Sequence, residues 1–391
     1  MRIGIDAACW SNQRGYGRFT RGLLNTLLKQ DKANEYILFV DPETDKTGEF
    51  PADVSRICFD ILEAPSKAAS SSGNRSLKDM WKASKAVSRE HLDLLFYPSV
   101  YTYFPVFTKA KKIVVIHDVI AEKYPQLIFN NRKHRFFWDI KVWVANKQAD
   151  LILTVSEFSK KGIIERFQIS ENCIRVVAEA PDKVFCQFPG TDLFHETLLR
   201  HGMDISTKFI LYVGGIAPHK NLATLVKAYS KLINETENKN IKLVLVGDYK
   251  KDVFLIDNSL QGLINCLRLK DKIIFTGFIP DEELVCFYNA AVVFVLPSFI
   301  EGFGLTAVEA MACGTPVIGS RTTSLPEVVG DAGLFFDPYN PDDLKDCLAT
   351  ILGNDELRNE LVCKSIQRAA TFSWEKSSMQ MLKVFNDFGI K

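Results

Sequence analysis

Short apolar runs that alternate with amphipathic stretches are the feature that most constrains how this chain can fold. Each run has the length of a strand and is bounded by polar or glycine residues. Strands separated by helical stretches predict parallel sheets with helices on their faces, and the alternation occurs in two series. We therefore expect an α/β protein with two Rossmann-like, doubly wound domains. The first series lies at 2–7, 36–40, 56–62, 92–97, 112–117, 150–155 and 174–178, and the second at 209–213, 242–247, 272–276, 292–296, 315–319 and 334–336.

The length and the segment between the two series set the expected domain boundaries. A chain of 391 residues suits two domains better than one. Ligands of doubly wound sheets bind beyond the carboxyl ends of the strands, so two such domains predict a cleft with one ligand on each wall. Pro189 and Gly190 mark the best candidate for a linker. We predict an N-terminal domain at 1–185, a linker at 186–205, a C-terminal domain at 206–370, and a helix at 371–391 that packs back on the N-terminal domain.

The composition excludes several classes of protein. A net charge of +1 gives no global field for binding nucleic acid, and no apolar run approaches the roughly 20 residues of a spanning helix. The nine cysteines include no C-x-x-C pair, and the six histidines include no H-x-x-x-H pair. No D-x-D motif is present to hold a metal on a diphosphate. With no signal peptide at the start, we expect a cytoplasmic protein that needs no metal and no other cofactor.

The strongest functional motif follows the predicted strand at 292–296. A glycine-rich turn there precedes a helix expected to run to about residue 312, where a glycine and a proline end it. The free N–H groups at the start of a helix attract a diphosphate, and we expect those of Gly304, Leu305 and Thr306 to do so. Glu309, about one turn into the helix, can accept two hydrogen bonds from a ribose diol, and Glu301 can reach the hydroxyls of a sugar. In the alternative, this is an ordinary helix start at which both glutamates only favour the helix dipole.

A longer pattern around this motif resembles a known family. Seven residues separate Glu301 from Glu309, and the sequences Ser-Leu-Pro-Glu at 324–327 and Gly-Asp-Ala at 330–332 follow. The chain resembles the retaining glycosyltransferases of family 4, which have the GT-B fold, and among them the bacterial mannosyltransferases of O-antigen and exopolysaccharide assembly. The match spans almost the whole chain, from residues 4–6 and 15–19 to 372–375, and its C-terminal motifs are specific whereas its N-terminal ones are looser.

The resemblance implies a function. The enzyme would move a hexose from a nucleotide sugar to a saccharide or polyprenyl-linked acceptor in cell-surface polysaccharide synthesis, with the donor on the C-terminal domain and the acceptor on the N-terminal domain. We expect mannose from GDP-mannose, with glucose or galactose from a UDP donor as the alternative. The family implies retention of the anomeric configuration, and no carboxylate is an obvious nucleophile for a double displacement. A front-face displacement, in which the leaving phosphate helps to deprotonate the acceptor, is therefore the expected course.

Further site residues come from strand ends in both series. Lys220 can act as a point charge on a leaving diphosphate, and His219 stands before it where the family usually has Arg. The resemblance places main-chain groups near Phe278 at the base and His117 at the transferred sugar. The expected catalytic residues are Glu301, Lys220 and His117. The expected donor-binding residues are Gly15, Gly17, Gly215, His219, Lys220, Phe278, Glu301, Phe303, Gly304, Leu305, Thr306 and Glu309, and those on the acceptor side are Arg18, Asp118 and Ser156.

Several alternatives stay open at this point. Gly15 and Gly17 with Asp41 are a partial dinucleotide fingerprint, which would suit an NAD-dependent dehydrogenase or epimerase. The His219 departure leaves room for a non-catalytic sugar-nucleotide sensor. His117 and Asp118 can form a structural pair at a strand end, Lys220 can be a solvated surface lysine, and Ser156 is a natural N-cap.

The segment 131–147 combines aromatic and basic residues on an expected helix. Its apolar residues at 136, 137, 140, 143 and 144 fall on one stripe, and basic residues stand at 132, 133, 135, 141 and 147. Such a helix can lie in a bilayer interface and attract anionic lipid, which would suit a polyprenyl-linked acceptor. Alternatively, the stripe packs on the sheet of the N-terminal domain.

Overall fold

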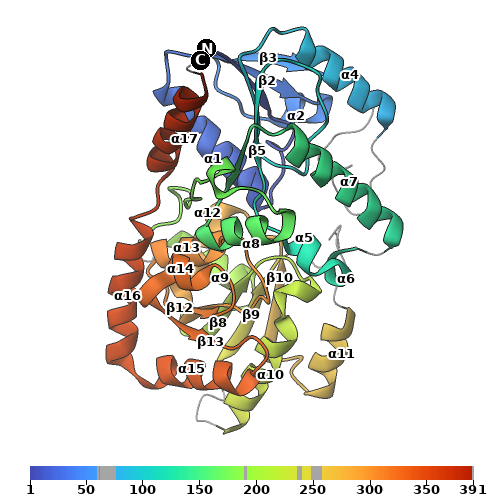
Figure 1. Ribbon diagram of the computed structural model, residues 1–391. Helices are drawn as coiled ribbons and strands as arrows, with labels where there is room; N and C mark the ends of the chain where they lie inside the picture. Colours follow the sequence, from blue (N-terminus) through green and yellow to red (C-terminus); the bar gives the residue numbers. More distant parts are fainter. Residues whose placement is uncertain are drawn as a thin grey trace. The chain divides into compact units, whose positions relative to one another are not determined.

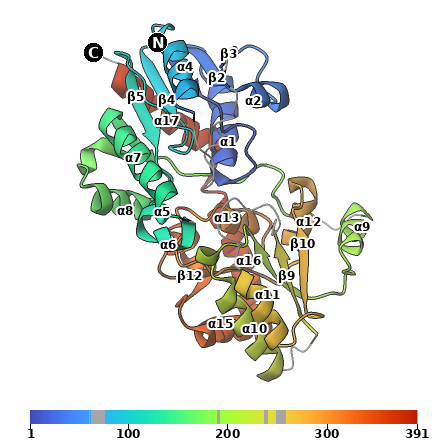
Figure 2. The same ribbon diagram turned by 90° about the vertical axis from the view of Figure 1, so that its right-hand side faces the viewer.

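A computed structural model describes residues 1–59, 61, 76–129, 131–188, 192–235, 240–247 and 258–389. The chain divides into two compact units (Figures 1 and 2). Unit 1 comprises Met1–Ala180 and Ser373–Lys391, and unit 2 comprises Pro181–Phe372. Each unit contains one parallel sheet with helices on both faces, so the expectation of two doubly wound α/β domains is confirmed.

The sheet of unit 1 has seven strands in the order β3-β2-β1-β4-β5-β6-β7. Every strand of the first predicted series forms. The run expected at 56–62 is the least accurate, because its strand ends at residue 58 and residue 62 lies outside the described residues. The strands are β1 (Arg2–Asp6), β2 (Glu35–Val40), β3 (Ser55–Cys58), β4 (Leu94–Tyr97), β5 (Lys111–Val115), β6 (Leu151–Thr154) and β7 (Ile174–Val176).

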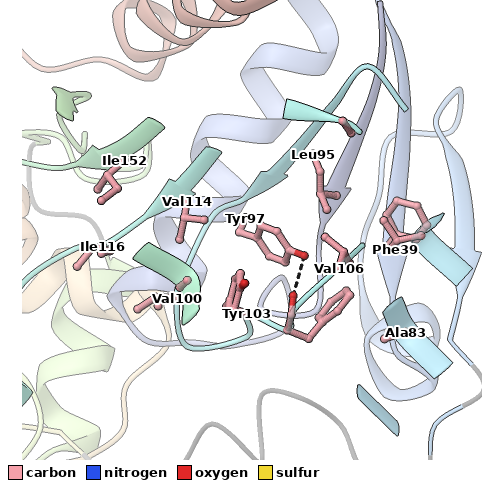
Figure 3. Close-up of a cluster of buried hydrophobic side chains, with 14 of the residues drawn as sticks. Phe39, Ala83, Leu95, Tyr97, Val100, Tyr103, Val106, Val114, Ile116 and Ile152 are labelled. Carbon is pink, nitrogen blue, oxygen red and sulfur yellow. Dashed lines mark hydrogen bonds between the residues drawn. The ribbon is translucent and has the colours of Figure 1, made fainter. Parts of the chain in front are cut away.

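Helices cover both faces of this sheet, because successive residues of each strand point to opposite faces. Leu95 and Tyr97 of β4 belong to the buried cluster drawn in Figure 3, whereas Phe96 between them packs edge-on against Phe385 of the last helix. The dashed line in Figure 3 marks the hydrogen bond that the Tyr97 hydroxyl donates to the Phe104 carbonyl, at 2.9 Å. The helices are α1 (Gly15–Gln30), α2 (Pro42–Thr47), α4 (Leu77–Ser88), α5 (Ile120–Lys123), α6 (Pro125–Ile128), α7 (Arg132–Gln148), α8 (Glu157–Phe167) and α17 (Trp374–Gly389).

Helix α7 presents an unexpected side to the sheet. Val142 and Ala145 join the buried cluster, with Trp138 and Val144 packed against it. The aromatic stripe lies on the opposite side of the helix, so its packing on the sheet was a wrong expectation for four of its five residues. These four are Phe136, Phe137, Ile140 and Trp143, which are 61%, 61%, 43% and 61% exposed.

Helix α17 packs on unit 1 although unit 2 precedes it in the sequence. Gly22 of α1 makes the closest approach possible, since a Cβ there would clash with the indole of Trp374. Ser377 donates to the Ala178 carbonyl at 2.7 Å, and Ser378 donates to Gln30 Oε1 at 2.7 Å. Helix α17 thus lies beside α1 on the same face of the sheet.

The sheet of unit 2 has six strands in the order β10-β9-β8-β11-β12-β13, and all six were expected. The strands are β8 (Phe209–Val213), β9 (Lys242–Val246), β10 (Ile273–Gly277), β11 (Val293–Leu296), β12 (Val317–Ser320) and β13 (Gly333–Phe336). The helices are α9 (Asp192–Arg200), α10 (Leu222–Glu235), α11 (Asn258–Cys266), α12 (Asp281–Ala290), α13 (Leu305–Ala312), α14 (Leu325–Val329), α15 (Pro341–Gly353) and α16 (Asp355–Ala369).

The linker expected at 186–205 is not a simple connection. The change of unit falls between Ala180 and Pro181, and residues 192–200 form α9 within unit 2. Phe194 and Leu198 of α9 are buried, so an apolar face holds the helix on the unit. Residues 189–191, which include the proline and glycine that suggested a linker, lie outside the described residues. No helix in the described ranges combines the length and apolar character needed to cross a bilayer.

Candidate active site

The strand order of unit 2 reverses between β8 and β11, which lie next to each other at the middle of the sheet. Ligands of doubly wound sheets bind at such a reversal, beyond the carboxyl ends of the strands. Lys220 follows β8 and Glu301 follows β11, so two of the predicted catalytic residues lie at this point.

Lys220 and Glu301 form an ion pair at the reversal. Lys220 Nζ lies 2.7 Å from Glu301 Oε1, and Ser298 Oγ donates to the same oxygen at 2.6 Å. The Glu301 side chain is 10% exposed and that of Lys220 is 21% exposed, so water screens the pair only in part. Both of these contacts are made by Oε1. They fix the carboxylate of Glu301, and with it the direction of Oε2. Ser298 was not predicted as a site residue, although its position just after β11 indicated it.

Two loops of unit 2 are joined behind this ion pair. Asn221 has a left-handed backbone (φ 56°), and its Nδ2 donates to the carbonyls of Pro297 at 3.0 Å and Pro338 at 2.8 Å. The N–H of Phe299 donates to the His219 carbonyl at 3.0 Å. His219 itself is buried. These bonds fix the loop that follows β8 against the loop that follows β11, so they hold Lys220 beside Glu301.

Helix α13 begins at the turn that the sequence predicted. Gly304 has φ +94° and a Cβ there would clash with Leu325, so glycine is required at this position. The N–H groups of Leu305 and Thr306 lie in the first turn, where a helix offers no carbonyl partner. Phe303 is buried, and its carbonyl accepts from Ser324 Oγ at 2.9 Å.

Glu309 lies one turn into α13 and is 1% exposed. The hydroxyl of Tyr288, on α12, donates to Glu309 Oε2 at 2.9 Å. Thr315 bonds the Tyr288 carbonyl, and Phe185 packs edge-on against its ring at 5.6 Å. Tyr288 therefore fixes the orientation of the buried carboxylate. Tyr288 was not predicted as a site residue, because it belongs to an otherwise ordinary apolar helix face.

Three glycines line the carboxyl ends of β8, β9 and β10. Gly214 donates to the Val246 carbonyl and Gly247 to the Gly277 carbonyl, each at 2.9 Å, and a Cβ on Gly247 would clash with Gly214. The Gly215 carbonyl accepts from the Tyr212 hydroxyl at 2.7 Å. Among the described residues just beyond these strand ends, Phe278 offers a large side chain that is 60% exposed.

In unit 1 the first glycine loop has mainly structural contacts. A Cβ on Gly17 would clash with the Asn12 carbonyl, whereas Gly15 has open space around it. Arg18 lies in the first turn of α1. Asp41 caps α2, and its carboxylate accepts from the N–H groups of Glu43 and Thr44. These contacts account for Gly17 and Asp41 without a dinucleotide.

His117 is buried just beyond β5, and both of its ring nitrogens face acceptors. Nε2 lies 3.0 Å from the Pro98 carbonyl, so it carries a proton there, and Nδ1 lies 3.4 Å from Glu179 Oε1. Phe19 packs edge-on against the ring at 4.9 Å. The carboxylate beside Nδ1 is thus that of Glu179, which was not predicted because 62 positions of sequence separate the two residues.

Two of the three predicted acceptor-side residues, Asp118 and Ser156, make local structural hydrogen bonds. Asp118 Oδ1 accepts from the N–H of Ile120 at 2.9 Å at the start of α5. Ser156 is the N-cap of α8, and its Oγ accepts from the N–H of Ser159 at 3.0 Å. The capping interpretation of Ser156 is therefore confirmed.

Comparison with known proteins covers nearly the whole chain. The family model for "Glycosyltransferase Family 4" matches residues 14–182, and the model for "Glycosyl transferases group 1" matches residues 200–368. Sucrose-phosphate synthase from Thermosynechococcus elongatus has the same fold. Its TM-score is 0.76 at 20% identity, over 99% of this chain and 98% of that one.

Two curated relatives are mannosyltransferases of Escherichia coli. The chain is 32% identical to O-antigen chain mannosyltransferase B over 278 residues, which cover 70% of each chain. It is 29% identical over 277 residues to the serotype-specific mannosyltransferase WbdA, and that match covers 70% of this chain but only 33% of WbdA. The chain therefore belongs to glycosyltransferase family 4, whose members have the GT-B fold and transfer hexoses with retention of configuration.

Proposed function

We propose that this glycosyltransferase transfers mannose from GDP-mannose to a saccharide or polyprenyl-linked acceptor in the synthesis of a cell-surface polysaccharide. The sugar is proposed from the two mannosyltransferase relatives. The observation that carries the proposal for the site is the Lys220–Glu301 ion pair, held by Ser298 at the strand reversal of unit 2. We propose that the reaction takes place in the cytoplasm.

In the proposed donor complex, the Lys220 ammonium group leaves Glu301 for the diphosphate. The freed carboxylate then accepts hydrogen bonds from sugar hydroxyls, with its orientation kept by Ser298. The first-turn N–H groups of α13 share the diphosphate charge, and Glu309 accepts from the ribose diol. Gly215, His219, Phe278 and Phe303 complete the donor site, and Gly15 is where the loop of unit 1 offers space for a ligand.

The proposed reaction is a front-face displacement. The bond from the anomeric carbon to the phosphate oxygen breaks while the acceptor oxygen forms its bond on the same face, and the departing phosphate takes the acceptor proton. The role of the chain is to position the reactants and stabilise the developing charge. His117, with Arg18, Asp118 and Ser156, is proposed to face the sugar and the acceptor.

We propose that no metal ion is required, because Lys220 and the α13 N-terminus supply the charge stabilisation that a metal would give. Activity should persist in excess EDTA. Full loss of turnover that magnesium or manganese restores would contradict this proposal.

The test of the donor is a thermal-shift panel of nucleoside diphosphates, followed by turnover with the matching sugars. GDP should raise the melting temperature of the wild type, and Glu309→Ala should reduce that shift. Release of GDP from GDP-mannose, faster with an added mannoside acceptor, would support the proposal. Stabilisation by UDP, with turnover of UDP-glucose or UDP-galactose, would show that the donor is a UDP sugar and not GDP-mannose. Absence of turnover with every donor would favour a non-catalytic nucleotide-sugar-binding protein. Stabilisation by NADH would favour the dehydrogenase alternative.

A further inference from the structure

Large exposed hydrophobic side chains are concentrated in one region of unit 1. Twelve are found among the described residues, and seven of them lie on α4, on α7 and at Phe107 between β4 and β5. Scattered exposed hydrophobics are normal on a protein surface, but a concentration of this kind marks an interaction site. The seven are Leu77, Trp81, Phe107, Phe136, Phe137, Ile140 and Trp143.

Helix α7 directs its largest apolar side chains away from the core. Phe136, Ile140 and Trp143 have the i, i+4, i+7 spacing of one helix face, opposite Val142 and Ala145, which pack in the core cluster. An outward stripe of two aromatic rings and an isoleucine costs free energy in water, because apolar area stays exposed.

Helix α4 and the segment before β5 extend this surface. Ala83 and Val87 of α4 belong to the same buried cluster as the inner side of α7, so both helices cover the same face of the sheet. Trp81 and Leu77 point outward, 61% and 79% exposed, and Phe107 is 83% exposed.

The segment that carries Phe107 is bonded to both helices. On the α4 side, Ser88 Oγ donates to the Phe107 carbonyl at 3.4 Å. On the α7 side, Gln148 Oε1 accepts from the Tyr103 hydroxyl at 2.8 Å and from the Val106 N–H at 3.2 Å. Helix α4, Phe107 and helix α7 therefore form one connected surface, which we call the α4–α7 face.

The α4–α7 face is strongly basic in a chain whose net charge is only +1. The two helices carry eight lysines and arginines against two acidic residues. Of the two acids, Asp79 is buried and Asp139 lies 3.7 Å from Arg135. Lys85 also lies over the ring of Trp81, 4.8 Å from its centroid. Lys141 turns its ammonium group to the Tyr101 carbonyl at 3.1 Å, so it does not contribute to the outer face. The other seven basic residues are Lys78, Lys82, Lys85, Arg132, Lys133, Arg135 and Lys147.

We propose that the α4–α7 face docks on the surface of a bilayer that contains anionic lipid. Basic groups are attracted to anionic headgroups, while aromatic and aliphatic side chains enter the boundary between headgroups and acyl chains. A second copy of the chain fits poorly, because a symmetric pair would place one basic surface against another. The proposal depends on residues outside the donor site, so it does not depend on which sugar is transferred.

The first test is co-sedimentation with vesicles of phosphatidylcholine alone and of phosphatidylcholine with phosphatidylglycerol. Wild type should bind the anionic vesicles, and added salt should weaken the binding. The charge variant changes Arg132, Lys133 and Arg135 to serine, and its matched control changes the exposed Lys227, Lys270 and Lys383 to serine. The charge variant should bind roughly tenfold to a hundredfold more weakly, and the control should bind within about threefold of wild type.

The second test probes the apolar component. Phe136→Ser with Trp143→Ser should weaken partition into anionic vesicles roughly tenfold or more, whereas the matched pair Leu199→Ser with Ile205→Ser in unit 2 should not. A blue shift of tryptophan fluorescence on vesicle addition should diminish in Trp143→Phe and Trp81→Phe. All positions are exposed, so melting temperatures should stay near that of wild type and would reveal a variant that fails to fold.

Three outcomes would overturn the proposal. Wild type that does not bind anionic vesicles at low salt has no membrane surface of this kind. Equal loss of binding in the charge variant and its control would show attraction without a defined face. Binding to duplex DNA as tight as to vesicles, unchanged by the Phe136 and Trp143 substitutions, would show a general polyanion site instead.

Discussion

The sheets of the two units share a strand order. In each, the second and third strands lie on one side of the first strand, and the fourth and later strands lie on its other side. Their loops differ at the point where this order reverses. In unit 2 a lysine and two glutamates gather there, and Ser298 and Tyr288 orient the glutamates. In unit 1 the comparable edge has His117 bonded between Pro98 and Glu179, and the unusual surface lies elsewhere, on α4 and α7. The comparison teaches that one architecture supports a charged ligand site in one unit and an apolar, basic outer face in the other.

The largest expected effect concerns the ion pair of unit 2. Lys220→Ala and Glu301→Ala should each lower kcat by at least about a hundredfold, or roughly 3 kcal/mol. The first removes the cation that stabilises the leaving diphosphate, and the second removes the carboxylate that positions the sugar. Steady-state kinetics would measure it. The matched control is the exposed pair of Lys364 and Glu360 on α16, also at 2.7 Å, where Glu360→Gln should change kcat less than about twofold. An equal loss of kcat from substitutions in the two pairs would show that the Lys220–Glu301 pair has no special role in catalysis.

The next effect separates the two buried partners on α12 and α13. Glu309→Ala should weaken donor binding by about 1.5–3 kcal/mol, because a ribose diol would lose a charged acceptor. Tyr288→Phe should raise the donor KM about threefold to tenfold and leave kcat nearly unchanged, because it removes only the group that orients Glu309. Glu309→Gln should be milder than Glu309→Ala, because it keeps one acceptor oxygen. An unchanged donor KM in Glu309→Ala would remove the ribose assignment.

A partly buried acid of unit 1 should affect stability instead of catalysis. Burial raises the pKa of Glu122 to about 7, and the indole N–H of Trp138 donates to it at 2.6 Å. A folded-state pKa above the unfolded value contributes stability at low pH that is lost as pH rises toward 7. Between pH 5 and 8 the free energy of unfolding should therefore fall less in Glu122→Gln than in the wild type. The difference should be roughly 1–3 kcal/mol, measured by urea unfolding. Its control is the exposed Glu171→Gln, whose pKa is lowered by a hydrogen bond from Lys160 and which should not change that slope.

The smallest expected effect is at His219. His219→Arg should keep kcat/KM within a few-fold of wild type or raise it, because a permanent charge suits a leaving diphosphate. A pH–rate profile of both proteins provides the measurement. Abolished activity in the variant would show that the wild type uses a neutral or acidic imidazole.

The strands of both units could be predicted because buried parallel strands are continuous apolar runs bounded by turns. The start of α13 could also be predicted from the sequence, because its positive φ angle at residue 304 favours glycine. The pairing of Lys220 with Glu301 could not be predicted, because a separation of 81 residues in sequence does not determine the distance between two side chains. Periodicity also could not show which side of α7 faces the core. Phe136, Ile140 and Trp143 have the spacing of a buried stripe, yet the smaller Val142 and Ala145 pack inside. The helix α9 was hidden by the proline and glycine beside it.

The return of α17 to unit 1 imposes an order on synthesis. The ribosome completes residues 1–180 first, but the helix that covers α1 and fills the notch at Gly22 emerges only after all of unit 2. At 5–20 residues per second, that interval lasts roughly 10 to 40 s. Throughout it the surfaces at Gly22 and Phe96 that later contact Trp374 and Phe385 are uncovered. We therefore expect the nascent N-terminal unit to bind chaperones that recognise exposed apolar surface during translation.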